Sequence, residues 1–364
     1  MRFEIESVAE FDAHVAATGT LRHCVLQSLD LRGRGPILSR VDVHDALFLG
    51  CRLSDILADE LPRRGASIFP RLPSVPFDAY RGQLYTADEL YGGLSGGYAE
   101  TPDGSTYAWT LSPAAGWLDA SLARALHDHS IGDALADVAP EPALGVGIMG
   151  GHAVPRGSAD YAAAARLAWQ LAGRGRSIIT GGGPGAMEAA NLGASFTGDL
   201  GQLAKACREL GRTPGFAEGV EPWARAAVAV RQRWDCTRPS LGVPTWFYGH
   251  EPPNLFATQI AKYFDNALRE EALLSLCGGG IVYLRGAAGT VQEIFQAFTR
   301  NYYAREVAQL RPLILVDVDY WTNVFPAWPL LSALGRGRLT EHHVHLVDTI
   351  DEALAALADS HAVA

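Results

Sequence analysis

Lysine is nearly absent from this chain: Lys205 and Lys262 are the only lysines among its 364 residues. An enzyme that uses pyridoxal phosphate needs a lysine to form a Schiff base, and neither lysine lies in a recognisable setting of that kind. The zinc-protease motif HExxH and the phosphate-loop motifs GxxxxGKS and GxxxxGKT are also missing. These absences argue against the corresponding enzyme classes, and no cofactor is predicted.

Disulfide patterns, excess positive charge and long hydrophobic runs are lacking too. The five cysteines are scattered without a CxxC pair, which is typical of reduced thiols in the cytosol. A formal net charge of -10 argues against electrostatic binding of nucleic acid. No apolar run approaches the roughly 20 residues of a membrane helix, and no signal peptide is visible. The sequence therefore predicts a cytoplasmic protein with neither membrane nor nucleic-acid partners.

Two glycine-rich turns stand out, each between an apolar run and a helical pattern. The first turn spans 180–185 (Thr-Gly-Gly-Gly-Pro-Gly) and the second spans 285–290 (Arg-Gly-Ala-Ala-Gly-Thr). Glycine lets a ligand approach the backbone closely, and the start of a helix presents N–H groups and the positive end of its dipole to an anion. Two such turns in one pattern of parallel strands predict a site for a nucleotide phosphate.

From about residue 143 the chain alternates short apolar runs with helical stretches. This is the pattern of a doubly wound, mostly parallel, Rossmann-like α/β sheet. A helix is predicted over 158–172 with Ser158 as its N-cap, and a long helix is predicted over 255–276. The predicted strands cover 144–149, 177–180, 243–248, 281–284, 313–316 and 344–347.

The first part of the chain differs in character. Residues 1–135 are interpreted as an additional N-terminal domain of unknown role, joined by a linker at 136–142 to the nucleotide-binding domain of 143–364. Prolines gather near residues 62, 70 and 76, and neither a βαβ rhythm nor an internal repeat is evident. A structural, lid or regulatory role is expected for this domain.

The stretch 147–194, which contains Gly-Gly-Gly-Pro-Gly-Ala-Met-Glu-Ala-Ala-Asn, resembles the Lonely Guy family of Rossmann-like phosphoribohydrolases, long labelled lysine decarboxylases. The family's second signature, Pro-Gly-Gly-x-Gly-Thr-x-x-Glu, is matched at 285–293 with Arg285 in place of the proline and Ala287 in place of a glycine. The resemblance covers about 143–358. Glu-Pro-Pro-Asn at 251–254 and the N-terminal domain also resemble the larger bacterial branch, the nucleotide 5'-monophosphate nucleosidases.

The resemblance implies hydrolysis of the N-glycosidic bond of a nucleoside 5'-monophosphate to free base and ribose 5-phosphate. It implies that Glu293 stabilises the ribosyl cation, engages its hydroxyls or activates water. The family carries an arginine on the preceding helix, and counting back from the second signature leads to Arg269 after a shift of one residue. Family members are typically homodimers, so a homo-oligomer (dimer or higher) is also implied.

Further phosphate or nucleotide contacts are expected from the loops. They are Gly150, Gly151, Gly181, Gly182, Gly183, Gly185, Met187, Asn254, Arg285, Gly286, Ala287, Ala288, Gly289 and Thr290. Simpler alternatives stand beside these roles: the glycines only allow tight turns, Glu293 only favours a helix start, Asn254 only turns the chain, and Met187 only packs beneath the loop. Arg285 either adds a phosphate ligand or indicates a site that has changed its ligand or lost turnover.

Two further patterns have ordinary explanations. The segment 145–150 fits GxGxxG of dinucleotide sites, but its first two glycines fall inside the only apolar run available, so 150–151 as a ligand loop is favoured. His342, His343 and His345 have metal-like spacing but lie at the entry to a late strand without a cysteine or carboxylate constellation nearby, and no metal site is predicted. Besides the hydrolase, a non-catalytic nucleotide sensor or carrier remains open, and a nicotinamide-dependent oxidoreductase is the weakest alternative.

Overall fold

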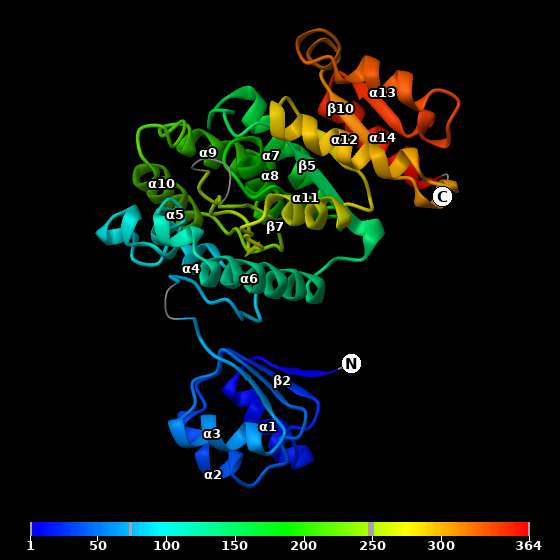
Figure 1. Cartoon of the computed structure of the whole chain (residues 1–364). Coiled ribbons are helices and arrows are strands. Elements are labelled where there is room, and N and C mark those ends of the chain that lie inside the picture. The colour runs from blue at the N-terminus through cyan, green and yellow to red at the C-terminus, as the bar shows by residue number, and fades with distance from the viewer. Residues whose placement is uncertain (1, 73–74, 247–250, 363–364) are drawn as a thin grey trace. The chain divides into compact units, whose positions relative to one another are not determined.

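The computed structural model describes residues 2–72, 75–246 and 251–362. The chain divides into two compact units (Figure 1). The N-terminal unit consists of Met1–Leu84 and Ser105–Asp137, and the C-terminal unit consists of Tyr85–Gly104 and Val138–Ala364. Residues 85–104, expected in the N-terminal domain, thus group with the C-terminal unit, while the linker at 136–142 stays a prediction. Within the described residues, no helix combines the length and apolarity that crossing a membrane requires.

A parallel sheet of seven strands organises the C-terminal unit. Its strand order is β11-β10-β9-β5-β6-β7-β8, and every neighbouring pair is parallel. This confirms the predicted doubly wound α/β fold. The strands are β5 (Gly145–Met149), β6 (Ser177–Thr180), β7 (Leu241–Gly242), β8 (Gln259–Ile260), β9 (Ile281–Tyr283), β10 (Leu313–Val316) and β11 (Val344–Val347).

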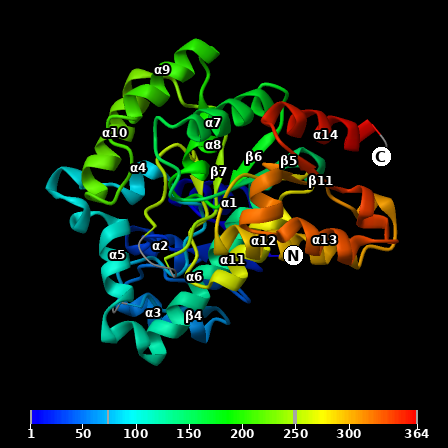
Figure 2. The same cartoon turned by 90° about the horizontal axis from the view of Figure 1, so that it is seen from above.

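Helices cover both faces of this sheet (Figure 2). On one face lie α7 (Ala159–Ala172), α8 (Ala186–Ser195) and α14 (Ile350–Ala362), and on the other lie α11 (Asn266–Ser275) and α12 (Ala288–Tyr302). The buried cluster of the first face joins sheet residues such as Val146 and Ile314 to helix residues such as Leu171 and Leu354. The other helices that include residues of this unit are α4 (Ala87–Leu90), α5 (Pro102–Thr110), α9 (Leu200–Leu210), α10 (Val220–Arg233) and α13 (Ala327–Gly335).

The order of strands creates a switch point between β5 and β9. These neighbours are followed by helices on opposite faces, α7 after β5 and α12 after β9. The two loops therefore diverge, and a crevice forms between them at the carboxyl ends of the strands, where open α/β sheets bind their ligands. Gly145 and Gly147 lie within β5, which confirms that the first two glycines of this GxGxxG pattern fall inside a strand.

Two predictions for this sheet were wrong. The strand predicted over 243–248 is β7 at Leu241–Gly242, and residues 247 and 248 lie outside the described residues. The helix predicted over 255–276 is in fact β8 followed by α11. Its first half is mostly buried, so the pattern of apolar and polar residues there does not separate strand from helix. Asp265 then starts the helix, because its side chain accepts hydrogen bonds from the amides of Ala267 and Leu268.

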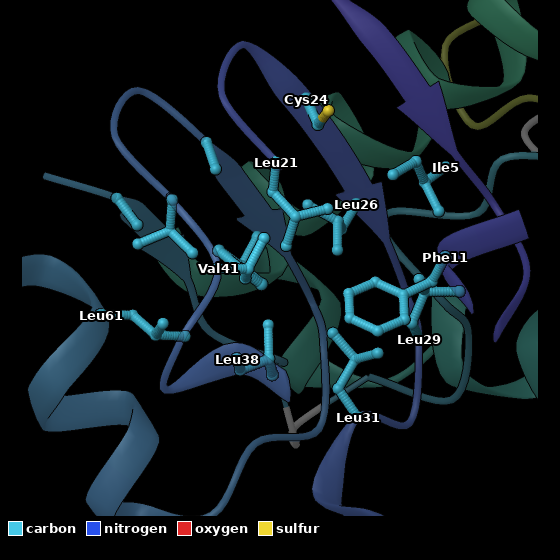
Figure 3. Close-up of a cluster of buried hydrophobic side chains, with 14 of the residues drawn as sticks. Ile5, Phe11, Leu21, Cys24, Leu26, Leu29, Leu31, Leu38, Val41 and Leu61 are labelled. Carbon is cyan, nitrogen blue, oxygen red and sulfur yellow. The ribbon is translucent and has the colours of Figure 1, made fainter. Parts of the chain in front are cut away.

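The N-terminal unit also contains a parallel sheet, so the interpretation that it has no βαβ rhythm was wrong. Its strands lie in sequential order: β1 (Phe3–Ile5), β2 (Cys24–Gln27), β3 (Leu47–Leu49) and β4 (Ser67–Phe69). The connecting helices are α1 (Val8–Thr18), α2 (Gly35–Leu38) and α3 (Asp55–Arg63), and the unit also contains α6 (Leu118–Asp137). Figure 3 shows Leu21, Leu26, Leu29, Leu31 and Phe11 among the side chains that form its core.

This sheet is built from a repeat that residue identity conceals. Val25 pairs with Leu47, and Leu47 pairs with Ser67, so equivalent positions recur after 22 and then 20 residues. Left-handed backbone recurs in the same register: His23, Asp45 and Gly65 have φ of 59°, 60° and 90° just before β2, β3 and β4. Three different residue types thus make the same bend, and strands of three or four residues are too short for a periodic signal.

Phe48 tests the packing of this repeat. It lies on β3 and is fully buried, whereas Ile56 on α3 is 77% exposed. Phe48→Ala should destabilise the N-terminal unit by about 3–5 kcal/mol, because it removes buried apolar surface and leaves a cavity. Hydrogen exchange of the Ser28 and Gly50 amides, which bond to Leu49 O and Phe69 O, measures this loss. Ile56→Ala, the control, should leave their protection unchanged within about 0.5 kcal/mol.

Candidate functional site

A cavity of about 790 Å³ lies at the switch point, which is within the size range of small-molecule sites. One wall is the segment 150–155 after β5, and a second is 285–290, after β9 and at the start of α12. The third wall consists of side chains from α11 and of Glu293 from α12. The crevice that the sheet order creates is thus a real hollow, and it is bordered by the second of the two glycine turns.

The second glycine turn borders the cavity along its whole length. All six expected residues, Arg285, Gly286, Ala287, Ala288, Gly289 and Thr290, line it. Helix α12 begins at Ala288, so the first amides of the helix have no partner within it and are available to an anion. A Cβ at Gly286 would collide with Thr290 Oγ1, which is why only glycine fits there. This loop has the local geometry of an anion site.

Gly150 and Gly151 also line the cavity, and they connect the two sides of the crevice. The amide of Gly151 donates to Arg285 O at 2.8 Å, and its carbonyl accepts from the amide of Ala186 at 3.1 Å. A Cβ at Gly150 would lie only 2.9 Å from the Cβ of Ala186. Glycine at this loop therefore allows three backbone segments to meet beside the cavity.

Arg269 and Glu293, the pair implied by the resemblance, meet in the third wall. Arg269 Nη1 lies 3.9 Å from Glu293 Oε1 and also contacts Glu270. Two backbone carbonyls fix the guanidinium in place: its Nε donates to Val243 O at 2.6 Å and its Nη2 donates to Gly181 O at 3.3 Å. One buried cation therefore stands between two buried carboxylates.

Burial controls the protonation of these carboxylates. Glu293 is 6% exposed. Its burial, with the neighbouring charge of Glu270, raises the pKa of Glu293 to about 8, although Arg269 opposes the shift. Burial also raises the pKa of Glu270, but its contact with Arg269 favours the charged form. At neutral pH Glu293 therefore keeps its proton, and the site presents an acid beside an ion pair.

The first glycine turn lies behind the cavity rather than on its surface. Met187 lines the cavity, which corrects the alternative that it only packs beneath the loop. A Cβ at Gly181 would lie 2.6 Å from Arg269 Nη2 and 2.8 Å from Met187 Sδ. The turn thus makes room for two side chains that do face the cavity. Gly181, Gly182 and Gly183 do not border the main cavity, and Gly185 borders a separate cavity of about 300 Å³.

Asn254 supports the first turn and does not border the main cavity. It is fully buried. Its Nδ2 donates to Gly183 O at 3.1 Å and to Asn191 Oδ1 at 2.8 Å, while its Oδ1 accepts from the amides of Phe256 and Ala257. With four hydrogen bonds to protein, its side chain has no capacity left for a ligand. The expectation of a ligand contact at Asn254 is therefore corrected to a supporting role.

Arg285 has a protein partner. Its guanidinium forms an ion pair with Asp317, which follows β10 directly and has a φ of 89°, a conformation that non-glycine residues rarely adopt. Tyr320 begins a π-helical turn (η7, Tyr320–Val324), and its hydroxyl donates to Gly286 O at 2.6 Å. Where the family signature has a rigid proline, this chain has an ionic and hydrogen-bonded tether between the loops after β9 and β10.

Several lining residues were missed by the sequence reasoning. Asn266, Glu270 and Tyr320 border the cavity, as does an ion pair between His152 and Glu251 at 3.0 Å. Glu270 had a local signal, since it is the residue reached by direct counting from the second signature before the shift to Arg269. Glu251 begins the Glu-Pro-Pro-Asn segment at 251–254, whereas His152, Asn266 and Tyr320 belong to no motif, because they come from separate segments that only the fold brings together.

The parallel sheet and the cavity at its switch point define a Rossmann-like α/β unit with a ligand site. Residues 224–359 match the family model described as "Possible lysine decarboxylase". The match supports the resemblance to the Lonely Guy family and contains Arg269, the second glycine turn and Glu293. No curated protein matches the chain. Among solved structures, the Moco carrier protein from Chlamydomonas reinhardtii is 17% identical, with a TM-score of 0.37, over 60% of this chain and 98% of that chain.

Asn254→Ala tests the supporting role of this residue. The change leaves Gly183 O and the amides of Phe256 and Ala257 without their partner in a buried place, so we expect the C-terminal unit to lose about 3 kcal/mol or more of its unfolding free energy. Guanidinium unfolding measures the loss. Asn323→Ala removes an exposed amide that donates a hydrogen bond to Asp319, and its effect should stay below about 1 kcal/mol. Equal effects would contradict the buried network.

Glu293→Gln tests the raised pKa. The unfolded-state carboxyl titrates near 4.5, and the folded one near 8. Between these values only the folded state holds the proton, so wild-type stability should fall as pH rises from about 4.5 through 8. The glutamine variant lacks this term, and its unfolding midpoint should rise relative to the wild type between pH 5 and pH 9. The exposed control Glu306→Gln should follow the wild type, and parallel curves for all three proteins would refute the buried acid.

Proposed function

We propose that this protein hydrolyses the N-glycosidic bond of nucleoside 5'-monophosphates and releases free base and ribose 5-phosphate. The observation that carries the proposal is that Glu293 and Arg269 lie close together in the wall of a cavity. The glycine loop 285–290 lines the same cavity. The loop is suited to the phosphate, and Glu293 lies one helical turn beyond Thr290 on the same helix. The phosphate and the scissile bond would thus be bound by one element.

The chemistry follows from the protonation states. Phosphate bound at the start of α12 supplies binding energy remote from the bond that breaks, and this energy positions the ribose. The C1'–N bond breaks with its electron pair on the base nitrogen, and the proton of Glu293 neutralises the departing base. Water then adds to C1' and returns a proton to the Glu293 carboxylate. The ion pair of Arg269 with Glu270 keeps the site close to neutral while the positive charge develops on the sugar.

A decarboxylase is not what we propose, although the matching family model has that name. A pyridoxal enzyme needs a lysine beside the cofactor. Lys262 is buried and forms an ion pair with Asp103 at 2.5 Å, and Lys205 is exposed on α9. Neither of these lysines borders the cavity. Their positions support a reaction that uses acid and base groups of the protein.

A nucleotide sensor or carrier without turnover is the second candidate. The observation that favours it is Arg285, which departs from the family signature and is held by Asp317. Ala287 is the other departure in the same loop. Such a protein would bind nucleotides through the loop and keep the glycosidic bond intact.

Turnover of a panel of nucleoside 5'-monophosphates, followed by chromatography of the free base, separates the two candidates. We expect release of base by the wild type, a loss of at least about 100-fold for Glu293→Gln because the acid is removed, and a normal rate for the exposed control Glu306→Gln. Above pH 8 the wild-type rate should fall as Glu293 loses its proton. Saturable binding without base release, converted to turnover by Arg285→Pro with Ala287→Gly, would instead establish the sensor or carrier.

A further inference from the structure

Acidic side chains gather on one face of the sheet in the N-terminal unit. Ile5 of β1 and Leu26 of β2 belong to the core of this unit (Figure 3), and successive side chains along a strand point to opposite faces. Glu4, and Glu6 just beyond the end of β1, therefore lie on the other face. One carboxylate oxygen from each of Glu4, Glu6 and Asp137 lies within 4.8 Å of the other two. Three negative groups thus meet at one place.

No side-chain cation offsets this charge. Within the described part of the N-terminal unit, arginine and histidine form their ion pairs with other carboxylates. Asp137 ends α6, whose last turn contains no basic residue, and the negative end of the helix dipole adds to its charge. Burial and the charges of Asp133 and Asp137 raise the pKa of Glu4. Burial and the neighbouring carboxylates also raise the pKa of Glu6.

An amide oxygen without a donor completes the group on its buried side. Gln27 follows Leu26 at the end of β2, on the face that carries Glu4 and Glu6. It is 7% exposed, and none of the described residues donates a hydrogen bond to its Oε1. A Cβ at Gly82 would lie 2.4 Å from Glu6 Oε1 and 2.7 Å from Gln27 Oε1, so both oxygens converge on the same side of Gly82. Two buried acceptors that converge in this way need a positive group between them.

The donor set selects a hard divalent cation. Carboxylate and amide oxygens bind Ca²⁺ and Mg²⁺, and the group contains neither the histidine nor the cysteine that softer metals prefer. Oxygens on opposite sides of a bound Ca²⁺ lie about 5 Å apart, which matches the spacing of the three carboxylates. Mg²⁺ demands a stricter octahedron and usually takes one or two carboxylates. Three carboxylates and an amide oxygen therefore suit Ca²⁺ better.

The position of Gln27 also favours an ion over water. Its Oε1 is closed to solvent, so bulk water does not supply the missing donor. A cation that has exchanged its hydration shell for the carboxylates is smaller than a water molecule and fits between Gln27 Oε1 and Glu6. Glu4 and Asp137 are exposed, so they offer the ion a path from the solvent.

We propose that Glu4, Glu6, Asp137 and Gln27 bind a calcium ion in the N-terminal unit. The ion joins the first strand, the end of β2 and the last turn of α6, and it turns repulsion among the carboxylates into attraction. Calcium therefore stabilises this unit. The site shares no residue with the cavity of the C-terminal unit, so it does not depend on the reaction proposed above.

Titration of the full-length protein with CaCl₂, after EDTA has removed metals, tests the proposal. Calorimetry should give a single ion per chain with a Kd of about 1 mM or lower, and MgCl₂ should bind more weakly. Hydrogen exchange of the Ser28 amide, which donates to Leu49 O, supplies a second readout. At a Ca²⁺ concentration of about 100 times Kd, exchange through unfolding of the unit should slow about 100-fold.

Glu6→Gln and Gln27→Leu separate ion binding from a purely structural role. In EDTA, the first relieves repulsion and the second removes an unpaired acceptor, so neither variant should exchange faster than the wild type. Each should bind Ca²⁺ at least about 10-fold more weakly, since each removes one ligand of the ion. Asp133→Asn is the matched control, because Asp133 is exposed and adds charge near Glu4 without belonging to the group. Its affinity should change less than about 3-fold.

Three results would overturn the calcium site. The first is the absence of heat and of slower exchange with Ca²⁺ up to about 10 mM, which exceeds the range of weak calcium modules. The second is an equal loss of affinity in Asp133→Asn and Glu6→Gln, which would indicate diffuse attraction of cations. The third is faster exchange of Gln27→Leu in EDTA, which would mean that Gln27 Oε1 is paired without an ion. Tighter binding of Mg²⁺ than of Ca²⁺ would overturn the choice of calcium.

Discussion

The guanidinium of Arg269 is the interaction on which the rest of the site depends. A buried cation needs compensating groups, since taking a charge out of water is costly. Here the compensation comes from the carboxylate of Glu270 and from the carbonyls of Val243 and Gly181, and the carboxyl group of Glu293 lies 3.9 Å away. These partners belong to four separate segments of the chain. The same contact that neutralises the cation therefore brings the end of the β7 strand, the first glycine turn, α11 and α12 together.

The two glycine-rich turns have similar compositions but different structural roles. The second turn lines the cavity and ends in a helix start, so its glycines shape the cavity wall. The first turn is covered by Arg269 and Met187, and its glycines leave space for these two side chains. The side chain of Asn254 stabilises that turn, because its Nδ2 donates hydrogen bonds to Gly183 O and to Asn191 Oδ1. Glycine-rich composition alone thus does not distinguish a turn that lines a cavity from a turn that packs behind it.

The fold of the C-terminal unit could be predicted where local signals agreed. Strands β5, β6, β9, β10 and β11 are apolar runs bounded by glycine or polar residues, and they were found nearly to the residue. Strands β7 and β8 have two residues each, which is too short for any period. The repeat of the N-terminal unit could not be seen in the sequence, because its units share backbone conformation and not residue type. His23, Asp45 and Gly65 all have positive φ but have no side-chain chemistry in common. In the site, Glu293 follows from a linear signature, whereas Tyr320 reaches Gly286 only through the pairing of β9 with β10.

The burial of Lys262 has a practical consequence for work with this protein. With one of its two lysines enclosed in an ion pair with Asp103, Lys205 on α9 is the single side-chain amine within reach of solvent. It does not border the cavity. Reagents that acylate lysine will therefore place one dye or one surface anchor at a defined point of the C-terminal unit. Attachment through this side chain leaves the lining of the cavity unmodified.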